Sequence, residues 1–261
     1  MKLFDSHCHL DDRSFRKDLD EVFKHASQEG VEKIMVVGIT QKSCHVAVDL
    51  SENNSGVYAS VGIHPHDVKD CSEEVLNDLK KLAQNKNVKA WGETGLDFNR
   101  MFSPRSLQEK WFVRQLELAD ELGLPLIFHE RDSNGRFSEI LKTDFKSSSK
   151  GVVHCFSGNR KELFDYLSMG LYIGITGIVT IEKRGLELRK LVTEIPSDRL
   201  LIETDAPYLA PAPQKNKTRR NEPAFVKSVL LKIAEVRRED PEALAEIIWK
   251  NTHQVYGVSG L

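Results

Sequence analysis

The sequence predicts a (β/α)₈ barrel, and two observations lead to this fold class. Eight short apolar runs recur along the 261 residues, and segments with helical periodicity lie between them. The runs are almost continuously apolar, as in parallel strands that are buried on both faces. No G-x-G-x-x-G motif follows the first run, which disfavours the alternative of an open doubly wound sheet. Eight alternating strand and helix units in a chain of this length match the barrel.

The predicted elements follow one another without a linker or an internal repeat, so we expect a single domain over residues 1–261. A long helix is predicted within 103–123, where Pro104 suits the first turn and Gly123 suits the C-terminal cap. Further helices are predicted at 159–170 and 242–253. The eight predicted strands are KLFDSH (2–7), VEKIMVVGIT (31–40), VYASVGIHP (57–65), VKAWGETGLD (88–97), LPLIFHE (124–130), GVVHCFSG (151–158), LYIGITG (171–177) and LLIETDAP (200–207).

Composition and charge exclude several classes of protein. A formal net charge of -2 gives no global field that would attract nucleic acid or membrane, so polyanion binding needs a local patch or a bound cation. The N-terminus lacks the pattern of a signal peptide, and no run is long enough to cross a bilayer. The four cysteines form no CxxC pair, which indicates a reduced, cytoplasmic location.

Metal-binding residue types gather at the carboxyl ends of the predicted strands, where barrel enzymes assemble their active sites. Six of the nine histidines fall in or just after these ends. Taken alone, each such histidine is more simply a core or loop residue, and Asp205 could merely begin a turn. Together they would bury many ionisable groups at one barrel mouth, which is costly unless a cation is bound. The six candidate ligands are His7, His9, Glu93, His129, His154 and Asp205.

The size of this ligand set predicts two divalent ions. One tetrahedral ion needs about four ligands, whereas six donors with one shared carboxylate suit two ions. Glu93, on the fourth predicted strand, is the candidate bridge. The donors are all nitrogen or oxygen, which leaves Mg²⁺, Mn²⁺ and Zn²⁺ open.

At this point the sequence resembles the TatD family of metal-dependent deoxyribonucleases. The motifs that carry the resemblance span nearly the whole chain in this order: DSHCHLDD, GIHPHD, GETGLDF, FHERD, HCFSG, GITGIVT, LLIETDAPYL and RRNEP. The resemblance implies a TIM barrel of the metal-dependent hydrolase type, with Mg²⁺ as the expected ion and DNA as substrate. It also matches the six candidate ligands to the family's ligands, and His64 and Arg131 to positions associated with the substrate phosphate.

The expected reaction is hydrolysis of a phosphodiester bond. Asp205 is both a ligand and the expected acceptor of the attacking water's proton, and Glu93 is the second catalytic carboxylate. Arg131 shares a strand face with His129, and its planar fork suits a phosphate; an ion pair with Glu130 or Asp132 is the alternative. Glu203 lies two residues before Asp205 and is expected to orient a ligand.

We expect an exonuclease that prefers single-stranded DNA ends, because base-paired DNA is too stiff to bend into a barrel mouth. The resemblance implies attack from the 3′ end and a role in DNA repair or degradation. We expect a monomer without an obligate protein partner. The loop KNKTRR (215–220) is either a solvated charged loop or a salt-sensitive DNA contact. The alternative activity is that of another binuclear amidohydrolase or lactonase, although no lysine stands at the end of the fourth strand to bridge the metals. A non-catalytic partner protein would be expected to have lost some of the six ligands.

Overall fold

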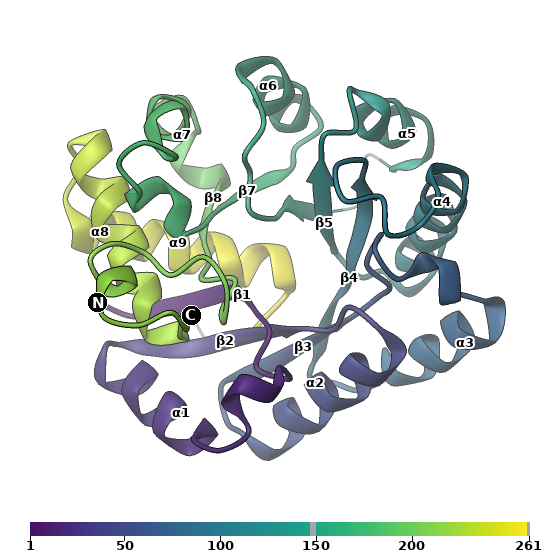
Figure 1. The fold of residues 1–261 in the computed structure, drawn as a ribbon, viewed down its shortest axis with the longest axis horizontal. Helices are drawn as coiled ribbons and strands as arrows, with labels where there is room; N and C mark the ends of the chain where they lie inside the picture. The colour runs from purple at the N-terminus through teal and green to yellow at the C-terminus, as the bar shows by residue number, and fades with distance from the viewer. Residues whose placement is uncertain (147–149, 260–261) are drawn as a thin grey trace.

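The predicted strands form one ring of eight parallel strands in the computed structural model, which describes residues 1–146 and 150–259 (Figure 1). Each strand pairs with the next in sequence. The first and last strands meet where the amide of His9 donates to the carbonyl of Ala206 over 2.7 Å and that of Asp205 to His7 over 2.9 Å. The strands are β1 (Leu3–Cys8), β2 (Val31–Val37), β3 (Val57–Val61), β4 (Val88–Asp97), β5 (Leu126–Arg131), β6 (Gly151–Val153), β7 (Tyr172–Ile175) and β8 (Leu200–Ile202).

Helices surround this ring, as the barrel prediction requires (Figure 1). The predicted long helix is α4, and Gly123 ends it in the left-handed conformation that favours glycine, with φ 66°. The last predicted helix is present and slightly longer than expected. The helices of the described residues are α1 (Leu19–Gln28), α2 (Gln41–Asn53), α3 (Glu73–Leu82), α4 (Arg105–Leu122), α5 (Arg136–Asp144), α6 (Arg160–Ser168), α7 (Leu186–Val192), α8 (Val226–Arg237) and α9 (Pro241–Tyr256).

The inside of the barrel is filled at one end by apolar side chains and by α9. Trp249, Val255 and Tyr256 of α9 pack against side chains contributed by most of the strands, and the Tyr256 hydroxyl donates to the carbonyl of Ser6 over 3.3 Å. This closes the amino end of the barrel and leaves the carboxyl end for polar side chains. The strand residues of this inner core are Phe4, Met35, Val37, Ala90, Ile127, Val152, Tyr172 and Leu201.

Two buried glutamines of α4 fix the loops that follow β3 and β4. The Gln115 carbonyl accepts from the amide of Ile63 over 2.8 Å, and its amide donates to the Ile63 carbonyl over 3.0 Å. Gln108, one heptad earlier on the same helix face, bonds the amide and carbonyl of Asp97 in the same way. Buried amides of this kind hold backbone groups that would otherwise lack partners, and so they position the residues around His64 and Asp97.

Two predicted strands are much shorter than their apolar runs. β6 ends at Val153 and β8 at Ile202, before the polar residues that the runs contain. Just beyond them Cys155 and Asp205 have φ 46° and 57°, so the backbone turns out of the sheet and carries the polar side chains with it. Among the described residues no helix combines the length and apolar character needed to span a membrane.

Candidate metal centre at the carboxyl end of the barrel

The six predicted ligands come together at the open end of the barrel. They arrive from five different places in the chain: the end of β1, the middle of β4, β5, and the segments that follow β6 and β8. All six are buried or nearly so, with Asp205 the most accessible of the carboxylates in the group. Strand ends that lie far apart in sequence therefore build one polar cluster, as the barrel geometry predicts.

His7, His9 and Glu93 form one compact donor group. The Nε2 atoms of His7 and His9 lie 3.3 Å apart, and His7 Nε2 lies 3.4 Å from Glu93 Oε2. The second group joins His7 and His154 to Asp205, whose Oδ1 lies 3.9 Å from His7 Nε2 and 3.7 Å from His154 Nε2. Both sets meet the distances expected of ligands that could share one ion.

Glu93 lies between the two sides of the cluster. Its Oε2 faces His7, whereas its Oε1 lies 2.8 Å from His129 Nδ1 and 3.4 Å from His64 Nε2. β4 can approach β5 this closely because a side chain at Gly95 would overlap the carbonyl oxygen of His129. A carboxylate whose two oxygens face different partners has the geometry of a bridge between two ions.

Two of the histidines are oriented by acceptors behind them. His9 donates its Nδ1 proton to the carbonyl of Val37 over 3.0 Å, and His154 donates its own to Glu203 over 2.8 Å. Both rings therefore direct Nε2 into the cluster. Glu203 is fully buried, and a side chain at Gly174 on β7 would occupy the space of its carboxylate. The structure thus places Glu203 behind His154.

A buried carboxylate that was not among the predicted site residues lies on the other side of His129. Asp97 Oδ2 lies 3.2 Å from His129 Nε2 and 2.7 Å from His66 Nε2. Burial alone would raise the pKa of Asp97, but hydrogen bonds from His129, His66 and the amide of Arg100 outweigh it and hold the pKa well below its usual value. Asp97 stands at the end of the predicted fourth strand, and this position could have indicated that it belongs to the polar cluster.

The histidines of the cluster fall into two groups, one with lowered and one with raised pKa values. Burial and the charge of His129 lower the pKa of His64 to about 4, and burial with the charge of His154 also lowers that of His7. For His9, burial acts in the same direction, but the hydrogen bond and charge of Asp205 dominate and raise the pKa to about 9. Without a metal, the cluster therefore balances its carboxylates with protons on some of its imidazoles, and a cation would displace those protons.

The spacing of the donors fits ligands of a divalent cation. Bonds of about 2.0–2.1 Å to one tetrahedral ion place its ligands about 3.3 Å apart, which matches the spacing of His7 and His9. The Nδ1 atom of His7 is buried and has no hydrogen-bond partner within residues 1–146 and 150–259. Its ring is held instead by stacking on His154, with centroids 3.4 Å apart. Nitrogen and oxygen donors of this kind suit several divalent metals.

The two predicted phosphate-binding residues occupy different positions. His64 lies inside the cluster, and its Nδ1 accepts from the amide of His66 over 3.0 Å, which leaves the Nε2 proton directed at the centre. Arg131 is exposed at the rim, in a hollow of about 770 Å³ between the β5 and β6 loops. Within the described chain its guanidinium makes no ion pair, so the alternative pairing with Glu130 or Asp132 is not formed.

Two exposed aromatic rings at the barrel mouth were not predicted from the sequence. Tyr208 is 55% exposed and its ring lies 6.1 Å from that of His9, whereas Phe102 is 57% exposed and lies 4.9 Å from His66. Because isolated aromatic residues in loops are common, their sequence positions alone gave no signal.

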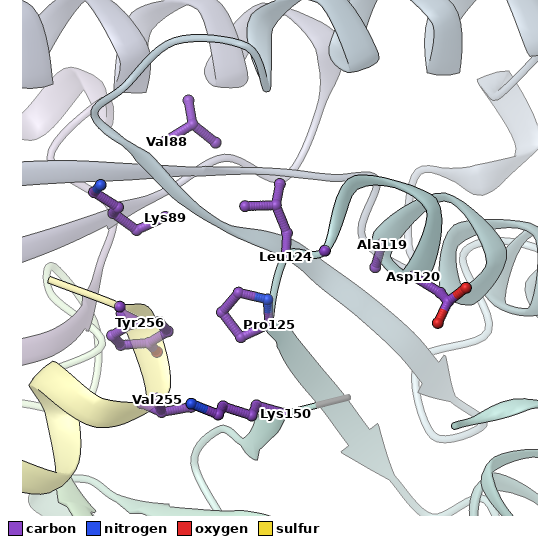
Figure 2. A pocket seen from close by; sticks show the side chains of 11 residues that line it. Val88, Lys89, Ala119, Asp120, Leu124, Pro125, Lys150, Val255 and Tyr256 are labelled. Carbon is purple, nitrogen blue, oxygen red and sulfur yellow. The ribbon is translucent and has the colours of Figure 1, made fainter. Parts of the chain in front are cut away.

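A second hollow lies at the opposite end of the barrel and is separate from this centre. It measures about 430 Å³ and lies among the start of β4, the ends of α4 and α9, and residues 124 and 125 (Figure 2). Two of its charged residues are engaged elsewhere: Lys150 donates to the carbonyl of Gln254 over 3.0 Å, and Asp120 pairs with Lys146. The described part of its lining offers no group of metal-binding side chains.

Comparison with known proteins identifies the family. The family described as TatD related DNase matches residues 4–257. The chain belongs to this family. A relative named 3′-5′ ssDNA/RNA exonuclease TatD, from Rahnella sp. (strain Y9602), is 43% identical over 260 residues, covering 98% of this chain and 99% of the relative. The protein of the same name from Klebsiella pneumoniae (strain 342) is 40% identical over 258 residues and covers 98% of each chain.

A solved structure agrees with this assignment. The TatD homologue YjjV from Escherichia coli K12 superposes with a TM-score of 0.90 at 29% identity, covering 98% of each chain. The family assignment and the barrel predicted from the sequence are therefore both confirmed. The phosphotriesterase homology protein from Escherichia coli, at a TM-score of 0.69 and 14% identity, shares the fold alone.

Proposed function

We propose that this TatD family member is a metal-dependent 3′–5′ exonuclease acting on single-stranded DNA. The observation that carries the proposal is the convergence of His7, His9, Glu93, His129, His154 and Asp205 at one barrel mouth. The TatD relatives named above are described as 3′–5′ exonucleases of single-stranded DNA and RNA, which supports the reaction class and adds RNA as a second substrate to test.

The proposed cofactor is a pair of divalent ions, with Mg²⁺ the expected metal and Mn²⁺ or Zn²⁺ as alternatives. Such ions, when bound, polarise the phosphodiester and lower the pKa of an attacking water. Glu93 would bridge them, the histidines would complete their coordination, and Glu203 would keep the lone pair of His154 directed at the site.

The remaining steps fall to this chain's own side chains. Asp205 Oδ1 faces the centre of the cluster and would accept the proton of the attacking water. His64 would donate its Nε2 proton to a phosphate oxygen, because its Nδ1 is already an acceptor. Arg131, which has no partner in the described chain, would hold the same phosphate from the rim with its planar fork.

The shape of the site supports attack at strand ends. The donors are buried within the barrel mouth, and base-paired DNA bends into such a space only at a large deformation cost. A single-stranded end is flexible and can reach the donors. We propose that the protein acts as a monomer in the cytoplasm, in DNA repair or degradation. The family match disfavours the alternative of an amidohydrolase or lactonase.

Two assays test this function. Linear, end-labelled single-stranded DNA, duplex DNA and RNA are each incubated with Mg²⁺, Mn²⁺, Zn²⁺ or a chelator, and a lactone serves as the substrate of the rival activity. We expect metal-dependent shortening of the single strand from its 3′ end and no lactone turnover. A covalently closed single-stranded circle of the same sequence should resist. Equal cutting of the circle and the linear strand would reject an end-dependent mode.

A further inference from the structure

We propose that the body of the single strand leaves the metal centre over the loops after β7 and β8, held by the ring of Tyr208 and by a cationic hollow. This inference rests on the proposed function and adds the path of the substrate to it. The hollow, called the cationic hollow below, measures about 390 Å³. Its lining residues are Ile178, Ile181, Arg184, Leu209, Ala210, Lys215 and Arg219.

The charge of the cationic hollow suits a phosphate backbone. Arg184, Lys215 and Arg219 line it, and no acidic residue does. Across residues 1–146 and 150–259, none of these three side chains takes part in an ion pair or a hydrogen bond. Three cations without partners gain most from meeting a polyanion, because no internal contact has to be broken first.

The walls of the cationic hollow are fixed before any ligand arrives. The amide of Ala212 donates to the Thr180 hydroxyl over 2.8 Å, which ties the loop after β8 to the loop after β7. Arg189 holds the latter loop by donating to the carbonyls of Val179 and Ile181 over 3.0 Å. A preformed surface loses little conformational entropy on binding, which favours it as a binding site over a mobile loop.

Tyr208 connects the cationic hollow to the metal centre. Its amide donates to the carbonyl of Asp205 over 2.8 Å, and its carbonyl accepts from the fully buried amide of Asn221 over 2.7 Å. The backbone is thus anchored while the ring remains exposed beside His9, and the next residue, Leu209, already lines the hollow. An exposed ring on an anchored backbone is a suitable platform for stacking one base.

The neighbouring hollow, which lies among the β5 and β6 loops and α7, has the opposite charge. Of its cations, Arg160 pairs with Glu194 over 2.7 Å and Lys190 pairs with Glu187 over 2.8 Å. Its excess of acids would repel a long polyanion, so it offers the strand body no favourable route. We call it the acidic hollow. Its acidic residues are Glu130, Asp132, Glu162, Glu187 and Glu194.

The test is the affinity of the Mg²⁺-loaded protein for a labelled single strand of about 12 nucleotides, protected by phosphorothioate linkages at its ends. Fluorescence anisotropy is recorded over about 0.05–0.3 M salt. The triple variant Arg184→Ala, Lys215→Ala, Arg219→Ala should bind about 10–100-fold more weakly, and the slope of log affinity against log salt should fall by about 2. The matched control, Lys2→Ala, Lys89→Ala, Lys150→Ala, removes the same charge at the closed end of the barrel and should bind as the wild type does. Figure 2 shows two of its three lysines, Lys89 and Lys150.

Tyr208 is tested separately because its contribution does not depend on charge. Tyr208→Ala should weaken binding by about 5–150-fold without changing the salt slope, and Tyr208→Phe should restore it. Wild-type affinity and slope in the triple variant would overturn the path. Failure of the wild type to degrade an unprotected strand would instead overturn the proposed nuclease, which the binding data do not decide.

Discussion

The cationic hollow and the acidic hollow are neighbours, since Arg184 lines one and Glu187, three residues later, lines the other, yet their charges differ in sign. The cationic hollow presents Arg184, Lys215 and Arg219 without partners in the described chain. In the acidic hollow, Arg160 and Lys190 are neutralised by glutamates, and only Arg131 is left without one. The net charge of -2 is therefore not spread evenly: one hollow is positive and the other is negative, and a polyanion would bind to the positive one.

The difference teaches that the count of charged residues matters less than which of them already have partners. A cation in an internal ion pair gives a phosphate little additional attraction, whereas an unpaired one releases counterions when it binds. The division also suggests separate tasks: the cationic hollow would hold the strand, and Arg131 would act only on the phosphate that reaches the metal centre.

The largest effect is expected at Glu93, which belongs to the donor cluster and lines neither hollow. Glu93→Ala should reduce the nuclease rate by about 10²–10⁴-fold, because it removes a ligand that faces both sides of the donor cluster. Calorimetry should find about two divalent ions per wild-type chain and a loss at both positions in this variant, whereas His7→Ala should chiefly weaken one. Binding of the protected strand by the cationic hollow should persist. Absence of any metal binding by the wild type would refute the donor assignment.

Arg131 is expected to give the next largest effect. Arg131→Ala should lower the rate by about 30–1,000-fold, the usual cost of a lost charged hydrogen bond in a transition state, while metal binding is retained. Strand affinity should change far less than in the triple variant of the cationic hollow. Arg131→Lys, which keeps the charge but not the fork, should recover only part of the rate. Wild-type nuclease rates in Arg131→Ala would show that the acidic hollow takes no part in the reaction.

Arg220 sharpens the comparison because it belongs to the same sequence motif as Lys215 and Arg219 but not to the cationic hollow. Its guanidinium bonds both oxygens of Asp18, over 2.7 and 2.8 Å, and lies over the ring of Phe15. Arg220→Ala should lower Tm by about 2–6 °C in a thermal unfolding experiment. Arg219→Ala should leave Tm unchanged and should instead weaken the binding of the single-stranded nucleic acid. A large loss of strand affinity in Arg220→Ala alone would contradict this division.

The motif KNKTRR shows where sequence reasoning reached its limit. Its two readings, a solvated loop and a nucleic-acid contact, treated the motif as a unit, but the structure separates Arg220 from Lys215 and Arg219. Adjacent loop residues point in directions that tertiary packing sets, so no periodicity predicts them. Tyr208 and Phe102 were missed for the same reason.

The donor cluster, by contrast, was predictable because it depends on topology alone. In a parallel barrel every strand ends on the same face, so polar residues at successive strand ends must converge. β6 and β8 are shorter than predicted, but His154 and Asp205 lie just beyond their ends, so both residues still reach the cluster. What topology could not supply was the contact of Asp97 with both His66 and His129, which depends on the exact register of neighbouring strands.

The smallest effect is expected from neutralising the acidic hollow, and it is the sharpest check on the comparison. Glu162→Gln with Glu187→Gln removes two negative charges from the acidic hollow without touching the donor cluster. If the strand body follows the cationic hollow, it contacts neither of these two carboxylates, and salt screens their charges, so the change in strand affinity should stay within about threefold at about 0.15 M salt. If the strand instead crosses the acidic hollow, the same double variant should bind clearly tighter, with a steeper salt slope, because Lys190 would lose its partner Glu187 and become available to phosphates. Anisotropy measured beside the triple variant distinguishes the two routes, since only one of the two variants can carry the main effect.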